Sequence, residues 1–398
     1  MSRDSTQALL PETRGRASKP AARASRISLQ TPSAAYDIHI GAGQFANLSR
    51  RLRSLTPGHL PRLFVVSSPD IWRLWSAPVL SSFADGPSPT ALLLPAGEAH
   101  KRLSSVERLA EQLAVAGADR DSLLLALGGG IVGDVTGFVA AIYMRGIDFV
   151  QLPTTFLAQV DSSTGGKTGV NLRVGKNLVG SFHHPLAVFA DTETLTTLPP
   201  REFRAGLQES IKAGVIRSPR LFRFLEESSE AILDKEHPRH TAAITRVLVG
   251  SVRIKAEIVA LDERESGVRM TLNFGHTLGH AIETATGYKQ LLHGEAVAWG
   301  SIAATHLALT RGAISRLDAT RIEQTILRYG PLPCFTATAK KIVELTASDK
   351  KNRSNTRSFI LPTGIGTVEI VRDVTEAELL RATDSMLALM RLQPKVKQ

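Results

Sequence analysis

Short apolar runs alternate with helix-like segments through the first half of the chain, and this alternation restricts the possible folds more than any other feature. The runs cover residues 63–67, 90–94, 122–127, 149–153 and 187–191. Intervening segments such as 105–117 carry apolar residues at helical spacing. Alternating strands and helices predict a parallel sheet with helices on both faces. In such sheets, ligands bind beyond the carboxyl ends of the strands.

The second half of the chain has a different hydrophobic pattern, in which long helical periodicities dominate. These patterns cover residues 202–216, 241–263, 275–286, 293–310 and 314–329. A hairpin is expected at 358–371, and a capping box at Thr375–Glu378 starts a last helix that reaches about Arg391. The Pro199–Pro200 pair lies between the segment of alternating strands and helices and the mostly helical segment. We therefore expect an α/β protein, with a parallel-sheet domain over 31–192 and a mostly α-helical domain over 193–398.

The net charge of +11 raises the question of nucleic-acid binding. Residues 1–26 hold six basic and two acidic groups, a net charge of +4, and the remaining charge is dispersed. Aromatic residues make up only 5% of the chain, so no basic surface interleaved with aromatic side chains is expected. A small anionic substrate accounts for the excess as well as nucleic acid does. We therefore expect no nucleic-acid partner.

The N-terminal 30 residues are rich in Ser, Arg and Ala, and we expect them to form a disordered basic tail. An organelle transit peptide is the alternative, although Asp4 and Glu12 weaken it. No run of about 18 apolar residues occurs, so no membrane span is expected. The single cysteine, Cys334, excludes an intrachain disulfide framework and a cysteine-based zinc site. We expect a cytoplasmic protein.

A glycine cluster directly follows the apolar run at 122–127. Gly128, Gly130 and Gly133 satisfy the G-x-G-x-x-G pattern between a strand and a helix-like segment, which favours dinucleotide binding in a Rossmann-like domain. The acidic residue at the usual ribose-binding distance, Asp148, stands at the start of the next strand. Glu98 and Lys101 follow the end of the strand at 90–94 and are better placed to contact a ligand.

Histidines and a glutamate suggest a metal site. His276 and His280 are four residues apart and share one face of a predicted helix, and His293 lies near the start of the next helix. The metalloprotease pattern H-E-x-x-H is absent, so a third ligand must come from elsewhere, and Glu209 is available on a predicted helix. Two histidines and one carboxylate with an open position are typical of catalytic zinc.

The stretch VDSSTGGKTGVN at 160–171 looks like a phosphate-binding loop but is not the ATP loop of a P-loop NTPase. That loop requires a glycine five residues before Gly166, where this chain has Asp161. Lys167 and the glycine amides remain suited to an anion. Further cations lie in glycine-rich or polar motifs: Arg145, Lys176, Arg201, Lys212, Lys255 and Arg269. Together with the nucleotide loop and the histidines, they indicate a metal-assisted, nicotinamide-dependent reaction on an anionic polyol.

Several ordered motifs give the chain a specific resemblance. They include GGGIVGDVTGFVAAIYMRGIDFVQLPTTF, DSSTGGKTGVN, GKNLVGSFHHP, LPPREFRAGLQESIKAGVI, DERESGVRMTLNFGHTLGHAIE, LLHGEAVAWG and SDKKNR. In this order, over roughly residues 35–390, the chain resembles the 3-dehydroquinate synthase family of the sugar phosphate cyclase superfamily. The resemblance implies NAD and zinc (or cobalt) in a cleft between the two domains, and a homodimer. It also implies conversion of 3-deoxy-D-arabino-heptulosonate 7-phosphate to 3-dehydroquinate and phosphate in the shikimate pathway, through transient oxidation by NAD, phosphate elimination, re-reduction and aldol closure.

The resemblance also implies roles for individual residues. The metal ligands would be Glu209, His276 and His293, leaving His280 for the substrate. The cofactor would contact Glu98, Lys101, Gly129, Gly130, Ile131, Val132, Gly133, Asp134, Thr154, Thr155, Lys167 and Lys176. The catalytic and substrate-binding set would be Arg145, Asp161, Lys167, Lys176, Asn177, Lys212, Lys255, Arg269, Asn273, His280 and Lys350.

Other functions within and outside this superfamily stay open. Valiolone-type cyclases change the positions matching Asn273, His280 and Lys350, which this chain keeps, so dehydroquinate is favoured over valiolone-type and deoxy-inosose products. Amino-dehydroquinate formation is harder to exclude because its site is nearly the same. A metal-dependent polyol dehydrogenase shares the general fold and would accumulate NADH.

Overall fold

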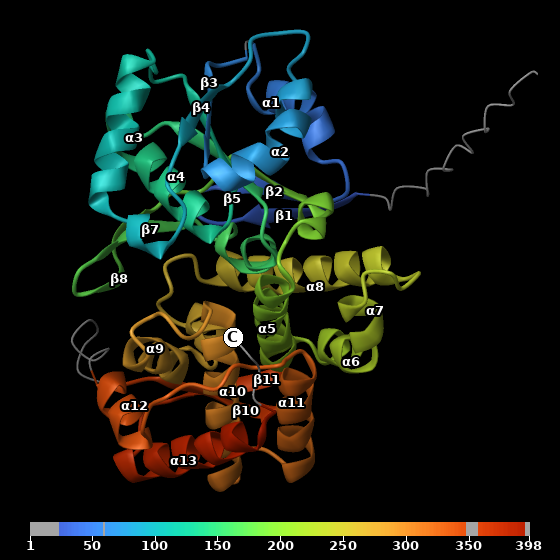
Figure 1. Ribbon diagram of the computed structural model, residues 1–398, viewed down its shortest axis with the longest axis vertical. Helices are drawn as coiled ribbons and strands as arrows, with labels where there is room; N and C mark the ends of the chain where they lie inside the picture. The colour runs from blue at the N-terminus through green and yellow to red at the C-terminus, as the bar shows by residue number, and fades with distance from the viewer. Residues whose placement is uncertain (1–23, 59, 348–356, 395–398) are drawn as a thin grey trace, which may run out of the picture.

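The computed structural model describes residues 24–394, except for residue 59 and residues 348–356. Predicted site residue Lys350, and residues 1–23 of the predicted tail, therefore lie outside the described residues. The chain forms two stacked parts, a sheet with flanking helices and a mostly helical part (Figure 1). Within the described residues, no helix has the length and apolar character needed to cross a bilayer.

A seven-stranded sheet forms the centre of the first part. In spatial order its strands are β1 Ser25–Gln30, β2 Ala35–Gly41, β9 Ala187–Asp191, β6 Asp148–Pro153, β5 Leu123–Gly128, β3 Leu63–Ser67 and β4 Thr90–Leu93. All neighbouring pairs are parallel except β1 with β2. The five predicted runs coincide with β3, β4, β5, β6 and β9, which confirms the predicted parallel sheet.

Helices cover both faces of this sheet, as predicted. They are α1 Leu48–Leu55, α2 Pro69–Ser81, α3 Leu103–Val115 and α4 Gly130–Ile142. Along β3 the side chains alternate: Phe64 and Val66 pack in one core with α3 and α4, whereas Leu63 and Val65 pack in another with α1 and α2. Because successive side chains of a strand point to opposite faces of the sheet, β3 contributes to two separate cores.

The N-terminal boundary of the sheet domain differs from the prediction. Residues 25–30, assigned to a disordered tail, form strand β1, so that assignment is wrong for this segment. Ile27 and Leu29 are buried, and β1 pairs along its whole length with β2. The segment has only two apolar residues, which alternate with basic and polar ones, so its local pattern did not predict a strand. Long-range packing stabilises it instead.

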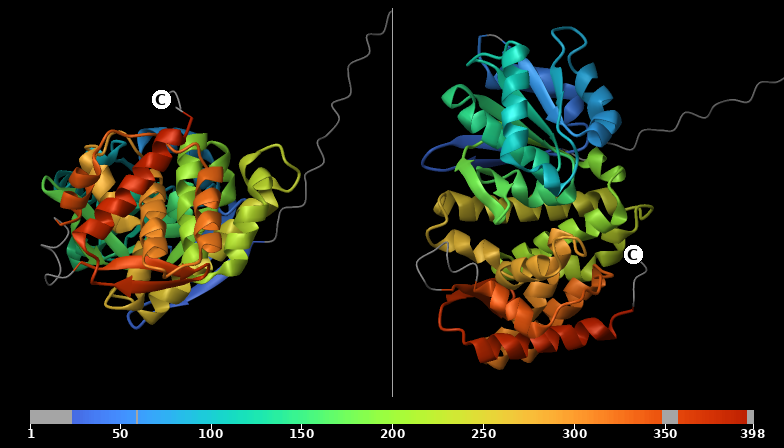
Figure 2. Two further views of the ribbon diagram at one scale, coloured as in Figure 1. Left: turned by 90° about the horizontal axis from the view of Figure 1, so that it is seen from below. Right: turned by 60° about the vertical axis from the view of Figure 1, so that its left-hand side comes forward.

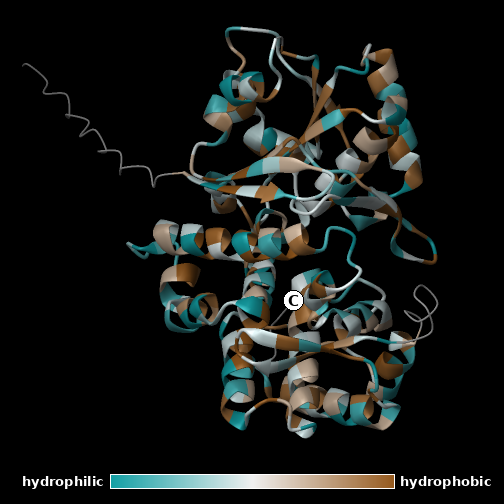
Figure 3. Cartoon of the chain, turned by 180° about the vertical axis from the view of Figure 1, so that it is seen from behind, coloured by the Kyte–Doolittle hydropathy of each residue, from teal (hydrophilic) through white to brown (hydrophobic). Residues whose placement is uncertain are grey.

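The second part is built mainly from helices. They are α5 Pro200–Arg217, α6 Pro219–Glu227, α7 Ser229–Leu233, α8 His240–Leu261, α9 His276–Ala285, α10 His293–Thr310, α11 Arg316–Arg328, α12 Ala339–Thr346 and α13 Glu376–Leu392. The five long predicted helical stretches and the last helix are present, as is the hairpin, formed by β10 Phe359–Gly364 and β11 Thr367–Val371. The hydropathy colouring alternates around the outer helices, as expected when one helix face is buried (Figure 3).

Helix α8 lies between the sheet and the remaining helices (Figures 1 and 2). Its buried residues Val252 and Val259 share one continuous core with Ile27 of β1 and Ile38 of β2. A second hairpin, β7 Lys167–Leu172 and β8 Gly175–Phe182, extends from the sheet domain beside α4. The functional side chains described next come from the strand ends, this hairpin and the helices below it.

Candidate active site

The glycine loop lies at the carboxyl end of β5, where α4 begins. A side chain at Gly133 would place its Cβ 2.7 Å from Gln151 Oε1 of β6, and one at Gly130 would come within 2.9 Å of Ser162 Oγ. A side chain at either position would therefore displace a neighbouring polar side chain, so glycine allows the close packing here. The Thr154 amide donates to the Gly128 carbonyl at 3.0 Å, which joins the ends of β5 and β6. The structure thus brings together the predicted cofactor residues Gly129, Gly130, Ile131, Val132, Gly133, Asp134, Thr154 and Thr155.

Polar side chains near neighbouring strand ends lie next to the glycine loop, and we call this region the cofactor side. Lys101, which is buried, donates to Asp134 Oδ2 and to Asn177 Oδ1. Glu98 Oε1 accepts from Asn171 Nδ2 at 2.7 Å, and Asn171 Oδ1 accepts from the Asn177 amide at 2.8 Å. Burial raises the pKa of Asp134 against the opposing charge of Lys101. Asn177, predicted to contact substrate, therefore lies with the cofactor-side groups.

Three potential metal ligands converge in the helical part. Glu209 lies on α5, and His276 and His293 are the first residues of α9 and α10. Glu209 Oε1 is 3.8 Å from each histidine Nε2. The ligand atoms of these residues lie within 4.8 Å of one another. Segments far apart in the sequence thus supply the two histidines and one carboxylate that the sequence predicted.

The chemistry of this cluster fits a zinc-type ion. Glu209 Oε1 is buried without a hydrogen-bond partner among the described residues, whereas Oε2 contacts Lys212. Separations of 3.8 Å are too long for hydrogen bonds. Metal–ligand distances of about 2.0–2.1 Å place tetrahedral ligands about 3.4 Å apart, so small adjustments would allow one ion to join all three. Burial, together with Lys212 and His293, holds the pKa of His276 well below its ordinary value, which favours the neutral imidazole that binds metals.

His280, the second histidine of the H-x-x-x-H pair, borders this cluster. Its ring centroid is 5.4 Å from that of His276 and 5.8 Å from that of His293. His280, Glu283 and His293 form a second group close enough to hold an ion. This group shares His293 with the first but includes the exposed His280. Buried Glu209, whose Oε1 has no hydrogen-bond partner among the described residues, favours the first group as the metal centre.

A charged group beside the metal cluster contains two buried lysines. Lys212 forms an ion pair with Glu209, and Lys255 Nζ donates to Asp161 Oδ1 and to the Asp161 carbonyl, each at 2.6 Å. Asp161 lies in a π-helical turn, Ala158–Ser162, a distortion frequent at functional sites. Burial alone would raise the pKa of Asp161, but Lys255 and Lys212 outweigh it and lower that pKa. Asp161 is therefore held as a carboxylate.

The loop after α8 contributes a third group of polar residues. Arg269 is buried and donates to the Gly165 carbonyl at 2.9 Å, where Gly165 has a φ of +104° that favours glycine. Lys167 forms an ion pair with Glu265, whose other oxygen accepts from Asn273 Nδ2 at 2.8 Å. Burial lowers the pKa of Lys167, against the raising effect of Glu265. The sequence analysis did not single out Glu265, although it lies inside a cation-rich motif.

A second glutamate that the sequence analysis missed joins the hairpin to the metal cluster. Glu283 Oε1 accepts from Lys176 Nζ at 2.9 Å, and Glu283 Oε2 lies 3.3 Å from His293 Nδ1. Lys176 Nζ also lies 4.3 Å from the ring centroid of Tyr288, within cation–π range. Lys176, predicted to lie between cofactor and substrate, thus faces the metal cluster.

Arg145 is the predicted site residue that the structure does not bring to the others. It follows the carboxyl end of α4, whose amino end forms the glycine loop. Thirteen helical residues separate the two ends by about 20 Å. Within one chain, Arg145 therefore lies far from the cofactor loop, beside the exposed side chains of Ile142 and Met144.

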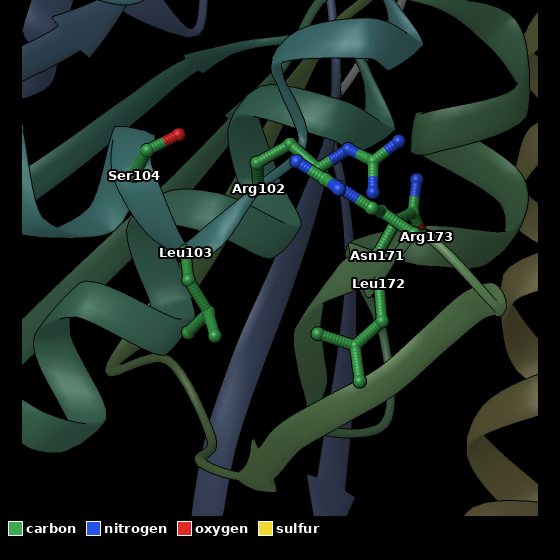
Figure 4. Close-up of a pocket in the computed structure, with 6 residues that line it drawn as sticks. All are labelled: Arg102, Leu103, Ser104, Asn171, Leu172 and Arg173. Atoms are coloured by element: carbon green, nitrogen blue, oxygen red, sulfur yellow. The ribbon is translucent and has the colours of Figure 1, made fainter.

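A surface pocket adjoins the cofactor side but lies outside the charged groups described above. It has a volume of about 440 Å³ and is lined by Arg102, Leu103, Ser104, Asn171, Leu172 and Arg173 (Figure 4). Asn171 links it to Glu98 through their hydrogen bond. The pocket lies where the start of α3 meets the β7–β8 turn, and the metal ligands contribute nothing to its lining.

Comparison with known sequences gives a consistent result across the chain. The model for the 3-dehydroquinate synthase N-terminal domain matches residues 91–205, and that for the C-terminal domain matches residues 206–352. The 3-dehydroquinate synthase of Koribacter versatilis is 46% identical over 362 residues, covering 91% of this chain and 98% of the relative. That of Solibacter usitatus is 46% identical over 361 residues, covering 90% and 99%.

Solved structures of sugar phosphate cyclases share the fold. The 2-epi-5-epi-valiolone synthase from Streptomyces hygroscopicus, with NAD+ and Zn2+ bound, has a TM-score of 0.82 and 27% identity, covering 92% of this chain and 100% of that one. A 2-deoxy-scyllo-inosose synthase with carbaglucose-6-phosphate, NAD+ and Co2+ has a TM-score of 0.81 and 25% identity, covering 91% and 99%. Both family models match in chain order and full-length relatives exceed 40% identity, so this chain belongs to the 3-dehydroquinate synthase family.

Proposed function

We propose that this protein is an NAD- and zinc-dependent carbon–oxygen lyase that converts 3-deoxy-D-arabino-heptulosonate 7-phosphate to 3-dehydroquinate and phosphate. One observation carries the proposal: the cluster of Glu209, His276 and His293 lies beside buried Lys212, and α5, which carries Glu209 and Lys212, contacts the same Ala158–Ser162 turn that α4 of the glycine loop contacts. A polyanionic sugar needs several fixed cations, and a transient oxidation needs a nucleotide and a Lewis acid. The family relationship supports this substrate.

Individual side chains would take distinct parts in this reaction. Lys212 and Lys255 hold Asp161 as a carboxylate, which suits it to accept a hydrogen bond from a substrate hydroxyl. Lys167, at the start of β7, and Arg269, in the loop after α8, would bind the substrate's anionic groups. Because these cations are fixed within a partly buried site, they stabilise negative charge more than mobile surface lysines do.

Glu209, His276 and His293 would hold the metal, and Lys101, Asp134 and the glycine loop would hold the cofactor. When bound, NAD supplies reversible hydride transfer, and the metal supplies Lewis acidity at the hydroxyl to be oxidised. The chain's own contribution is to orient the sugar between these two groups.

We also propose that the protein acts as a homodimer in the cytoplasm. Arg145 matches a substrate-binding position of the family, yet it lies at the far end of α4 from the cofactor loop of its own chain. Ile142 and Met144, which flank it, are 48% and 41% exposed. An interface over this end of α4 would cover both apolar side chains and bring Arg145 next to a second copy. Analytical ultracentrifugation of the wild type and of Met144→Glu tests the dimer.

The decisive experiment measures phosphate release from 3-deoxy-D-arabino-heptulosonate 7-phosphate, with zinc-loaded protein and a catalytic amount of NAD. A coupled dehydroquinase converts dehydroquinate into an absorbing product. We expect equal amounts of phosphate and absorbing product without a build-up of NADH. An active-site control, Glu209→Gln, should lose both bound zinc and turnover.

Two other activities are separated by the same assay. Phosphate release from sedoheptulose 7-phosphate or glucose 6-phosphate instead would indicate another sugar phosphate cyclase, and an amino-substituted analogue would test amino-dehydroquinate formation. Stoichiometric NADH with a simple polyol would indicate a dehydrogenase. A glycerol dehydrogenase from Schizosaccharomyces pombe has a TM-score of 0.60 at 16% identity, which supports a shared fold and nothing more.

A further inference from the structure

Glu283 occupies an unusual place for an acidic residue. It lies on α9, its side chain is only 4% exposed, and its two oxygens face two different partners. Oε2 is 3.3 Å from Nδ1 of His293, and Oε1 is 2.9 Å from Nζ of Lys176. One carboxylate therefore contacts both a candidate metal ligand of the helical part and a lysine of the hairpin from the sheet part.

The contact with His293 determines which ring nitrogen is available to a metal. A carboxylate beside Nδ1 favours the tautomer that carries its proton there, because Nδ1–H can then donate to Oε2. The lone pair of Nε2 is left on the opposite side of the ring, where Glu209 Oε1 lies 3.8 Å away. Glu283 thus orients His293 toward the buried cluster without itself occupying a ligand position there.

The contact with Lys176 fixes the β7–β8 hairpin. The ammonium of Lys176 lies between Glu283 and the ring of Tyr288, 4.3 Å from the ring centroid. Tyr288 is itself held in place, because its amide donates to the Glu283 carbonyl at 2.8 Å and its hydroxyl hydrogen-bonds Thr284. Glu283 lies near the end of α9, and Tyr288 lies in the turn that follows this helix. The same hairpin carries Lys167 and Asn177, so anchoring it also places those side chains.

We propose that Glu283 is a positioning residue that couples the metal centre to the cofactor side of the cleft, by orienting His293 with one oxygen and anchoring the Lys176 hairpin with the other. The inference deepens the proposed function because it concerns the same site. It requires the metal centre of Glu209, His276 and His293 but not the identity of the sugar.

The charge state of Glu283 suits both contacts. Burial alone would raise its pKa, but the hydrogen bonds from His293 and Lys176 and the charge of Lys176 lower that pKa. The carboxylate is therefore ionised at neutral pH and accepts a charge-assisted hydrogen bond from each partner.

The test compares four proteins: wild type, Glu283→Gln, Lys176→Met and the control Glu257→Gln, which alters an exposed glutamate of α8. Zinc affinity is measured by competition with a chromophoric chelator, and NAD affinity by calorimetry. Glu283→Gln keeps the shape but loses the charge. We expect it to weaken zinc binding about 10–100-fold, the usual cost of losing an outer-shell partner, and to weaken NAD binding as well. Lys176→Met should weaken NAD binding while changing zinc affinity less than about threefold.

Two results would overturn the inference: unchanged zinc affinity in Glu283→Gln, or an equal loss of zinc affinity in Lys176→Met. Thermal unfolding of the metal-free proteins checks that each variant folds. If Glu283→Gln does not fold, Glu283→Asp replaces it, because its shorter side chain cannot reach both partners. The proposed function fails separately: a wild type that binds zinc through Glu209 but releases no phosphate would leave the role of Glu283 intact.

Discussion

A single added methyl group on α10 should separate two of the proposed metal ligands. Gly294 follows His293 on α10, and it packs against the backbone of α5. Helix α5 also carries Glu209. A Cβ at this position would overlap the carbonyl oxygen of Ala205 and lie 2.6 Å from its carbonyl carbon, where ordinary contact begins at 3.4 Å. Both obstacles are backbone atoms of a buried helix. Gly294→Ala therefore forces α10 and α5 apart by about 1 Å.

The expected effects follow from that displacement. His293 Nε2 and Glu209 Oε1 are 3.8 Å apart, and a further 1 Å brings them to about 4.8 Å. Two ligands on one zinc ion, each about 2.1 Å from it, cannot be more than about 4.2 Å apart. We expect zinc affinity to fall by at least about 100-fold, the upper range for losing even an outer-shell partner. Overpacking should also cost about 1–3 kcal/mol, or roughly 2–12 °C in Tm.

The assay is chelator competition for zinc, with thermal unfolding of metal-free protein beside it. Gly86→Ala is the matched control, because a Cβ there has only Arg53 Nη2 nearby, at 3.5 Å. Zinc affinity of Gly294→Ala equal to that of Gly86→Ala would refute the reasoning. It would mean either that the helices absorb the methyl group without moving the ligands, or that His293 does not bind the metal.

Three further predictions test the charges. Lys212→Met leaves the Glu209 carboxylate buried without its cation, so the chelated protein should lose about 3–5 kcal/mol of stability in urea unfolding, and zinc should restore part of it. Asp161→Asn should lower kcat/KM about 100-fold or more, with zinc affinity changed less than about threefold; an equal loss of both would contradict a substrate role. Glu378, whose pKa the hydrogen bond from Arg311 lowers to about 2, contributes stability that is present above its ordinary pKa of 4.5 and is lost as pH falls toward 2. Glu378→Gln should therefore lower the free energy of unfolding at pH 7 by about 1–2 kcal/mol, a value already reduced for solvent screening. In thermal unfolding, this loss should shrink as the pH falls from 4 to about 2.5. A loss of stability that does not vary with pH would refute the prediction.

The sequence predicted those parts of the fold whose signals are local. The run at 63–67 is buried at every position and apolar at its first four because both faces of β3 are covered, and the runs for the other central strands stand out for the same reason. The last helix was found from its capping box, in which Thr375 and Glu378 hydrogen-bond as the pattern implies. Such signals lie within a few residues of one another and need no tertiary information.

Features that depend on long-range packing were not predicted. Strand β1 is buried by helix α8, more than 200 residues later, and has a weak local pattern. The β7–β8 hairpin is rich in glycine and polar residues and contributes few side chains, such as Val170 and Val179, to a hydrophobic core, so its local apolar pattern is weak. Glu283 and Glu265 form ion pairs with Lys176 and Lys167, respectively. Because these lysines lie about 100 residues away in sequence, the pairs could not be predicted from local patterns. Spacing alone also could not show that Arg145 is separated from the cofactor loop by the length of α4.

The shared core between the first hairpin and α8 has a consequence for how this protein is made. Strands β1 and β2 leave the ribosome before the other strands of the sheet, yet β2 pairs with β9, about 150 residues later, and β1 packs on α8 after about 220. At 5–20 residues per second, translation takes about 10–40 s to supply the last of these partners. An isolated two-stranded hairpin is at best marginally stable in water. Strands β1 and β2 therefore lack these partners until α8 has been synthesised, so the first two strands of the sheet are among the last to reach their native contacts.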